Sequence, residues 1–271
     1  MRLLVVACLV VVPLAAGCVS TVAGAPRAGG TVPPTTTTTD PPKVGRYAVG
    51  DCLVPEDSTP VPCGEPHDYE VTISDHLPAG IPDTYPPELD IVAGPVCISR
   101  LADYTGNDDA DASRLQPAYV WPDETEWAAG ERWFACLVSE DDPYGNPVPR
   151  IGSVRDVLAD GLGDLRACLI GRPADPGDIQ MVPCDQPHRS EAVPPVIVLG
   201  EVEDPAPTQD EILGMTNGPC RDAVRDYLGG EERPGVSWGM TYGSPEQWKQ
   251  GFVTATCFAI SDTSVTGLMG G

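Results

Sequence analysis

The chain has 271 residues, of which 40 are acidic and 16 are Lys or Arg, so its net charge is −24. This acidity argues against a nucleic-acid partner and against flat docking on anionic lipid, because both surfaces would repel the protein. The chain begins with "MRLLVVACLVVVPLAAGC", in which one arginine and an apolar run too short to stay in a bilayer precede small residues. This pattern predicts a signal peptide over residues 1–17.

The ending "LAAGC" resembles a bacterial lipobox, which implies cleavage before Cys18 and attachment of lipid to its sulfur. The alternative is an ordinary signal peptide that is cut a few residues away. Residues 18–46 are rich in Pro, Thr and Gly and almost free of large apolar side chains, so they are predicted to form a linker. We therefore expect a protein on the extracytoplasmic face of the cell membrane, held there by a lipid anchor.

The rest of the chain contains an internal duplication. Its eight cysteines form two sets of four, and corresponding members lie 116 to 123 residues apart. "VPCGEPHDYEV" returns as "VPCDQPHRSEAV", which repeats His67 as His188 and Glu70 as Glu191. Because several fixed spacings recur in one order, the sequence predicts two homologous domains, residues 47–150 and 151–271.

Each repeat alternates short β-rich segments with one helical segment. "YAVGDCLV", "EVTIS" and "RWFACLV" are typical of strands, whereas residues 86–106 open with proline and acid, end in glycine and read as a helix that "AGP" breaks or kinks. A step of seven residues puts Cys97 and Tyr104 on one helical face, and Cys220 and Tyr227 repeat this spacing. The predicted fold class is α+β: two tandem homologous disulfide-stapled modules, each a small β-sheet with one main helix.

Exported cysteines in even number indicate disulfides. Among the patterns that repeat in both domains, we favour first-to-second and third-to-fourth, because the first loop reads as a hairpin tip and its counterpart is five residues longer. The favoured pairs are Cys52–Cys63, Cys97–Cys136, Cys168–Cys184 and Cys220–Cys257.

The repeated Cys, His and Glu residues could in principle bind a metal or form a nucleophile–base pair. Both uses need a free thiolate, which an oxidising compartment removes from Cys63, and a zinc site also needs further ligands. We therefore predict no metal and no cofactor. His67, Glu70, His188 and Glu191 are predicted to be structural, and the alternative is that they line equivalent ligand surfaces.

Two other patterns are weaker. "GVSWG" matches the G-x-S-x-G motif of serine hydrolases, but no histidine follows Ser237, as the order Ser, acid, His in that fold requires. "GNDDADAS" (106–113) lacks the central Gly and terminal Glu of an EF-hand and is predicted to be a solvated loop. The sequence therefore contains no catalytic constellation, and we expect no enzyme.

Tryptophans are the remaining candidates for an exposed function, because grouped aromatic rings stack on sugars or anchor protein partners. Trp127 and Trp248 each lie nine residues before a cysteine, which favours a place in the core beside a disulfide. The full set of candidates is Trp121, Trp127, Trp133, Trp238 and Trp248.

The motifs "VGDC", "VPCGEPHDYEV", "WPDETEWAAGERWFAC" and "GSVRD" together resemble the septum formation domain of actinobacterial exported proteins, in two copies. The second copy departs from it, since "TGLMGG" keeps only a remnant of "GSVRD". The resemblance implies a cell-envelope protein associated with cell division and brings no catalytic residues.

These observations predict a non-enzymatic lipoprotein that binds an envelope or division protein or a cell-wall component. The first alternative is a lipoprotein that binds a small ligand or glycan through its tryptophans. The second is a hydrolase that uses Ser237 or a His/Glu site.

Overall fold

The computed structural model describes residues 43–55, 59–81, 83–85, 89–173 and 180–270. Three predictions lie wholly or mostly outside these ranges: the signal peptide, the lipidation of Cys18, and the linker except for its last residues. Within them, no helix has both the length and the apolar character needed to cross a membrane.

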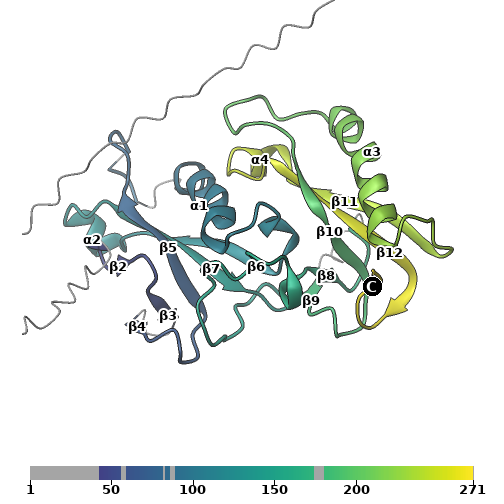
Figure 1. Cartoon of the computed structure of the whole chain (residues 1–271). Coiled ribbons are helices and arrows are strands. Elements are labelled where there is room, and N and C mark those ends of the chain that lie inside the picture. The colour runs from purple at the N-terminus through teal and green to yellow at the C-terminus, as the bar shows by residue number, and fades with distance from the viewer. Residues whose placement is uncertain (1–42, 56–58, 82, 86–88, 174–179, 271) are drawn as a thin grey trace, which may run out of the picture. The chain divides into compact units, whose positions relative to one another are not determined.

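The first module contains one five-stranded antiparallel sheet with the strand order β4-β3-β5-β7-β6 (Figure 1). A two-stranded hairpin, β1–β2, precedes it. The strands are β1 (Lys43–Val44), β2 (Tyr47–Ala48), β3 (Cys52–Val54), β4 (Thr59–Val61), β5 (Tyr69–His76), β6 (Leu115–Val120) and β7 (Trp133–Glu140). The helices are α1 (Asp90–Thr105), the 3-10 helix η1 (Ala110–Ala112) and α2 (Glu124–Ala128).

The second module repeats this topology, because its antiparallel strand order β9-β8-β10-β12-β11 matches the first sheet strand for strand. Its strands are β8 (Cys168–Leu169), β9 (Met181–Val182), β10 (His188–Val198), β11 (Val236–Tyr242) and β12 (Thr254–Val265). Its helices are η2 (Gly163–Leu165), α3 (Gln209–Tyr227) and α4 (Pro245–Trp248). The predicted α+β class with two stapled modules is confirmed.

Each module contains one strand that the sequence did not predict. The predicted elements were a strand pair, a helix and a return strand, which is β7 in the first module and β12 in the second. Strands β6 and β11 come between the helix and the return strand in the chain, and each forms an edge of its sheet. Pro117 interrupts β6 and Gly239 interrupts β11, and both residues normally argue against a strand. An edge position tolerates them because one side of the strand makes no ladder hydrogen bonds.

Four disulfides tie these elements together, in the pairs favoured from the sequence. Cys52–Cys63 and Cys168–Cys184 close the hairpins β3–β4 and β8–β9. Cys97–Cys136 and Cys220–Cys257 join each long helix to its return strand. Pro95 and Pro219 lie inside these helices, so the predicted proline break does not end either one.

Each disulfide to a helix also fixes which face of the sheet the helix covers. Because Cys136 faces α1, the alternate residues Trp133, Ala135 and Leu137 face away from it. That second face packs against the β1–β2 hairpin, where Tyr47 meets Trp133 edge-on with ring centroids 5.8 Å apart.

The helix-free face of the second sheet is covered by the first module. Phe258 and Ile260 alternate with Cys257, so they point away from α3, and they share one buried cluster with Leu101 of α1 and Ala112 of η1. Backbone hydrogen bonds cross the same boundary, for example from Ala167 N to the Ala112 carbonyl at 2.9 Å. The modules therefore stack head to tail, with the helix side of one on the open sheet of the next.

The acidic stretch 106–113 belongs to this contact, so its prediction as a solvated loop was wrong. It contains η1, in which Ala110 and Ala112 are buried, and the following Ser113 is also buried. Asp111 accepts a hydrogen bond from Thr254 Oγ1 at 2.6 Å across the modules. Asp109 likewise accepts from the backbone N–H of Val196 at 2.7 Å, while the small residues next to the two carboxylates fill the core.

Close approach at the other end of α1 requires a residue without a side chain. A Cβ on Gly94 would lie 2.7 Å from the carbonyl oxygen of Gln250, in the turn after α4. This glycine therefore lets the helix backbone touch the second module directly.

Candidate functional site

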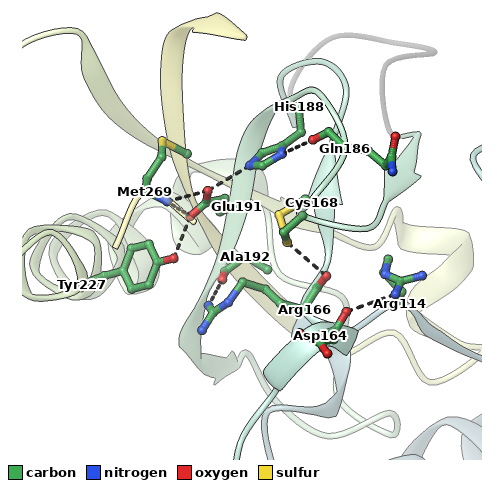
Figure 2. Close-up of a disulfide and its surroundings, with 11 residues drawn as sticks. Arg114, Asp164, Arg166, Cys168, Gln186, His188, Glu191, Ala192, Tyr227 and Met269 are labelled. Atoms are coloured by element: carbon green, nitrogen blue, oxygen red, sulfur yellow. Dashed lines mark hydrogen bonds and ion pairs between the residues drawn. A yellow bond between two sulfur atoms is a disulfide. The ribbon is translucent and has the colours of Figure 1, made fainter. Parts of the chain in front are cut away.

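The repeated His/Glu pair of the second module lies at the start of β10, beside the Cys168–Cys184 disulfide (Figure 2). His188 and Glu191 are both fully buried. The ring of His188 is held at both nitrogens, with Nδ1 at 2.7 Å from the Gln186 carbonyl oxygen and Nε2 at 2.9 Å from Glu191 Oε1. Because a carbonyl and a carboxylate both accept hydrogen bonds, this geometry favours the doubly protonated, charged ring.

The pKa of His188 agrees with that arrangement. Burial alone lowers the pKa, but the hydrogen bonds to Glu191 and Gln186 and the charge of Glu191 outweigh it and raise the pKa above its usual value. At pH values below the folded pKa of His188, the site is therefore a buried ion pair.

Glu191 has further donors on its other side. Tyr227 at the end of α3 donates its hydroxyl to Oε2 at 2.7 Å, and the backbone N–H of Met269 lies 2.8 and 2.9 Å from the two oxygens (Figure 2). Burial, followed by the hydrogen bond to Glu191, raises the pKa of Tyr227 to about 12, so the hydroxyl remains a donor at neutral pH. One carboxylate thus joins strand, helix and C-terminal segment.

The first module has the same plan with one difference. Glu70 accepts from Tyr104 OH at 2.5 Å, Ser153 Oγ at 2.7 Å and Val154 N at 2.7 Å. His67 Nδ1 lies 2.9 Å from the Glu65 carbonyl, but its buried Nε2 has no hydrogen-bond partner among the described residues. In the first module, the hydroxyls of Ser153 and Tyr104 therefore both donate to Glu70. Of the two repeated pairs, only His188 and Glu191 in the second module are hydrogen-bonded through the ring.

The segment after each return strand is held in the same way. Gly152 N donates to the Cys63 carbonyl at 2.7 Å, and Gly267 N donates to the Cys184 carbonyl at 2.8 Å. "GSVRD" and "TGLMGG" are therefore equivalent segments despite their different sequences. Residues 152–158, beyond the boundary predicted at residue 150, contact the first module in this way. Val154 N donates to Glu70 and Met269 N donates to Glu191, so the repeated Glu anchors this segment in both modules.

The same side chains do not fit a metal ion. Potential ligand atoms of Cys52, His67 and Glu70 lie within 4.8 Å of one another, as do those of Cys168, His188 and Glu191. Both cysteines are in disulfides, so their sulfurs are not thiolates, and zinc binds the thiolate. The sequence suggested Cys63 as the ligand. The cysteine that lies with His67 and Glu70 is instead Cys52, the disulfide partner of Cys63.

Three of the five candidate tryptophans are buried and cannot stack on a ligand: Trp127, Trp133 and Trp248. Trp127 Nε1 donates to the Asp83 carbonyl at 3.1 Å, and Trp248 Nε1 donates to the Asp204 carbonyl at 3.0 Å. This shared contact explains their shared spacing. Trp127 and Trp248 are therefore core residues, as their spacing to cysteine predicted, and of the five candidates Trp121 and Trp238 are half-exposed.

Ser237 lies within strand β11, where its hydroxyl is 3.5 Å from the Ile260 carbonyl oxygen. A nucleophile elbow instead places its serine on a sharp turn between a strand and a helix. The "GVSWG" match therefore lacks the geometry of a serine hydrolase.

Sequence reasoning missed the donors to the two carboxylates. The sequence places Tyr104 and Tyr227 on the cysteine face of each helix. It does not show that their hydroxyls donate to Glu70 and Glu191. The repeated step of seven residues from cysteine to tyrosine was the signal that could have shown it. Met269 carries no such signal, because it contributes only its backbone.

We expect the buried ion pair to make stability depend on pH. Because the pKa of His188 is raised on folding, its contribution is fully present below the unfolded value of about 6.5 and is lost as the pH rises through the folded value. Urea unfolding across this range should show that loss in the native protein and in the exposed-site control His76→Gln. It should be absent in His188→Gln, and an unchanged pH dependence in that variant would contradict the assignment.

Comparison with known proteins places these features in a family. The family model described as septum formation matches residues 90–257, from the start of α1 to Cys257 in β12. Two uncharacterized membrane proteins of Mycobacterium tuberculosis, from strains CDC 1551 and H37Rv, are each 26% identical over 200 residues. The aligned part is 68% of this chain and 44% of each relative, so the chain matches less than half the length of these proteins. No solved structure matches.

The family match covers more than half of the chain and includes the helix of the first module and the return strand of the second. This chain therefore belongs to the septum formation family.

Proposed function

We propose that this protein is a non-enzymatic, lipid-anchored component of the cell envelope that acts by binding during septum formation. The observation that carries the proposal is the use of both His/Glu motifs as buried anchors. His67, Glu70, His188 and Glu191 are all inaccessible to a substrate, and both carboxylates hold helix and tail in place. The side chains best suited to chemistry thus support the framework and leave the surface for recognition.

The family and its relatives support an envelope location. The relatives are named as membrane proteins, and four disulfides suit an oxidising compartment. The proposed attachment is acyl lipid on Cys18, followed by the Pro/Thr-rich linker. If extended at roughly 3.1 Å per residue, that linker would let the modules reach several tens of ångströms from the membrane. The proposed partner is an envelope or division protein or a wall component.

The test is the position of the full chain in dividing cells. A fluorescent label belongs in the linker, because the C-terminal segment is bonded to Glu191 through Met269. We expect enrichment at the division site, and we expect Cys18→Ala to leave the membrane fraction because it cannot be acylated. Uniform distribution together with normal septa in a deletion strain would contradict the septal role, and retention of Cys18→Ala in the membrane would contradict the anchor.

A further inference from the structure

The contact between the modules identifies a surface that this fold uses to bind protein. On the first module it consists of parts of α1, η1 and the start of β6, represented by Leu101, Ala112 and Leu115. All three are buried, and they share one apolar cluster with Phe258 and Ile260 of the second module.

Strand register identifies the equivalent surface of the second module. Tyr119 pairs with Cys136 and Met240 pairs with Cys257, so β11 corresponds to β6 residue for residue. In this register Val236 takes the place of Leu115, and Trp238 takes the place of Pro117. On the helices, Val224 takes the place of Leu101, each four residues after its disulfide cysteine.

This second surface contains a cavity of about 520 Å³ instead of a packed neighbour. Val224, Leu228, Val236 and Trp238 supply its apolar lining, between the end of α3 and the start of β11. Trp238 is one of the two half-exposed tryptophans, and among the described residues its indole makes no hydrogen bond such as those of Trp127 and Trp248. The cavity thus offers the position that a neighbour fills in the first module.

The edge beside the cavity is suited to strand pairing. β11 pairs with β12 on one side, and no strand of the described residues pairs with its other side. Its sequence, "VSWGMTY", contains no proline and no charge, which are the usual protections of an exposed edge. In β6 the equivalent of Trp238 is Pro117, which removes a backbone donor. The second module lacks this protection.

The charges around the cavity indicate the kind of segment that fits. Three of the eight basic residues in 151–271 line it: Arg221, Arg225 and Arg233. Arg225 is 3.0 Å from Asp222, Arg221 is 3.8 Å from the same carboxylate, and Arg233 donates to the Met269 carbonyl at 2.6 Å. Guanidinium groups keep further donors for a carboxylate after one such contact. Glu231 and Glu232 also line the cavity and would repel a uniformly anionic polymer.

We propose that β11 binds an extended segment of a partner protein, which adds a strand to the second sheet. An aliphatic or aromatic side chain of that segment enters the cavity against Val224, Leu228 and Trp238, and flanking carboxylates pair with the arginines. Main-chain hydrogen bonds supply affinity in this mode of recognition, and side-chain pockets supply specificity. The inference rests on the proposed binding function and names its surface and class of partner.

The test is photo-crosslinking of the full chain in its own cells. A photoreactive residue replaces Ser237, which is exposed on β11, and a control replaces Ser99, which is exposed on α1. We expect an adduct at position 237 alone, and mass spectrometry should map it to a segment of another envelope protein with an apolar side chain between acidic residues.

Paired charge variants make the result specific. The double variant Arg221→Gln/Arg225→Gln should lower the adduct yield at least about fivefold, because arginines at a binding site are frequent hot spots. The matched control Arg100→Gln/Arg172→Gln also removes two exposed, ion-paired arginines, but none that lines the cavity, and should leave the yield unchanged. Equal thermal midpoints of the two variants would show that the loss is not unfolding.

The other outcomes overturn the proposal in distinguishable ways. An adduct to a second copy of β11 would assign the edge to self-association, and an adduct to lipid or glycan would assign the cavity to that ligand. Absence of a specific adduct in a protein that still localises to the septum would reject this surface and leave the envelope function standing.

Discussion

Replacing Glu191 with alanine is expected to lower the free energy of unfolding by about 3–5 kcal/mol, the usual cost of removing one partner of a buried ion pair. The change leaves three donors without an acceptor: the buried Nε2 of His188, the buried Met269 N–H and the half-buried Tyr227 hydroxyl. Each lies on a different element, so the tail, the helix and the strand lose their common contact. Denaturant unfolding monitored by tryptophan fluorescence measures the loss.

Two variants give this prediction its controls. Glu191→Gln keeps one carbonyl acceptor and the shape of the side chain, so its cost should be smaller than that of alanine. Glu201→Ala removes an exposed carboxylate from the same module and should change stability by less than about 0.5 kcal/mol. A cost for Glu191→Ala as small as that of the exposed control would show that the carboxylate is not an anchor.

Removing the Cys97–Cys136 disulfide is the second change with a large expected effect, about 2–5 kcal/mol. Both cysteines are buried, and the bond closes a separation of 39 residues between α1 and β7. In the chain-entropy account, the denatured state gains more freedom when a longer loop is released. The double variant Cys97→Ala/Cys136→Ala should therefore unfold at clearly lower denaturant concentration.

The hairpin disulfide of the same module is the matched comparison. Cys52–Cys63 closes a separation of only 11 residues, so its removal should cost about 1 kcal/mol less on loop length alone. Unfolding of both double variants without reductant tests the ranking. A larger loss for the hairpin bond would mean that contacts around Cys52 outweigh the entropy of the loop.

The duplication explains how much of this fold could be predicted. Two copies of one pattern reduce the plausible cysteine pairings, and the common step from cysteine to tyrosine places both residues on one helical face. The edge strands were missed because Pro117 and Gly239 oppose strand propensity, and only the finished sheet shows that an edge tolerates them. The sequence therefore predicted the elements that carry repeated motifs. It did not predict the edge strands, because their stability depends on their position in the sheet.

The burial of the candidate site could not be predicted from the sequence either. His188 and Glu191 were identified from their repetition, but charge alone could not show that they are buried, since charged residues are seldom inside. The acidic stretch around Asp111 was misread for the same reason. Its carboxylates are offset by donors such as Thr254, which is distant in the sequence, so the compensation appears only in three dimensions.

Because the modules are stacked, we expect them to unfold together. Phe258 and Ile260 belong to the second sheet but share one core with Leu101 and Ala112, so neither half can melt without exposing apolar surface of the other. Val154 and Leu158, from the segment that joins the halves, are fully buried in that core. The duplicated chain is therefore one thermodynamic unit, and its heat-capacity trace should contain a single transition.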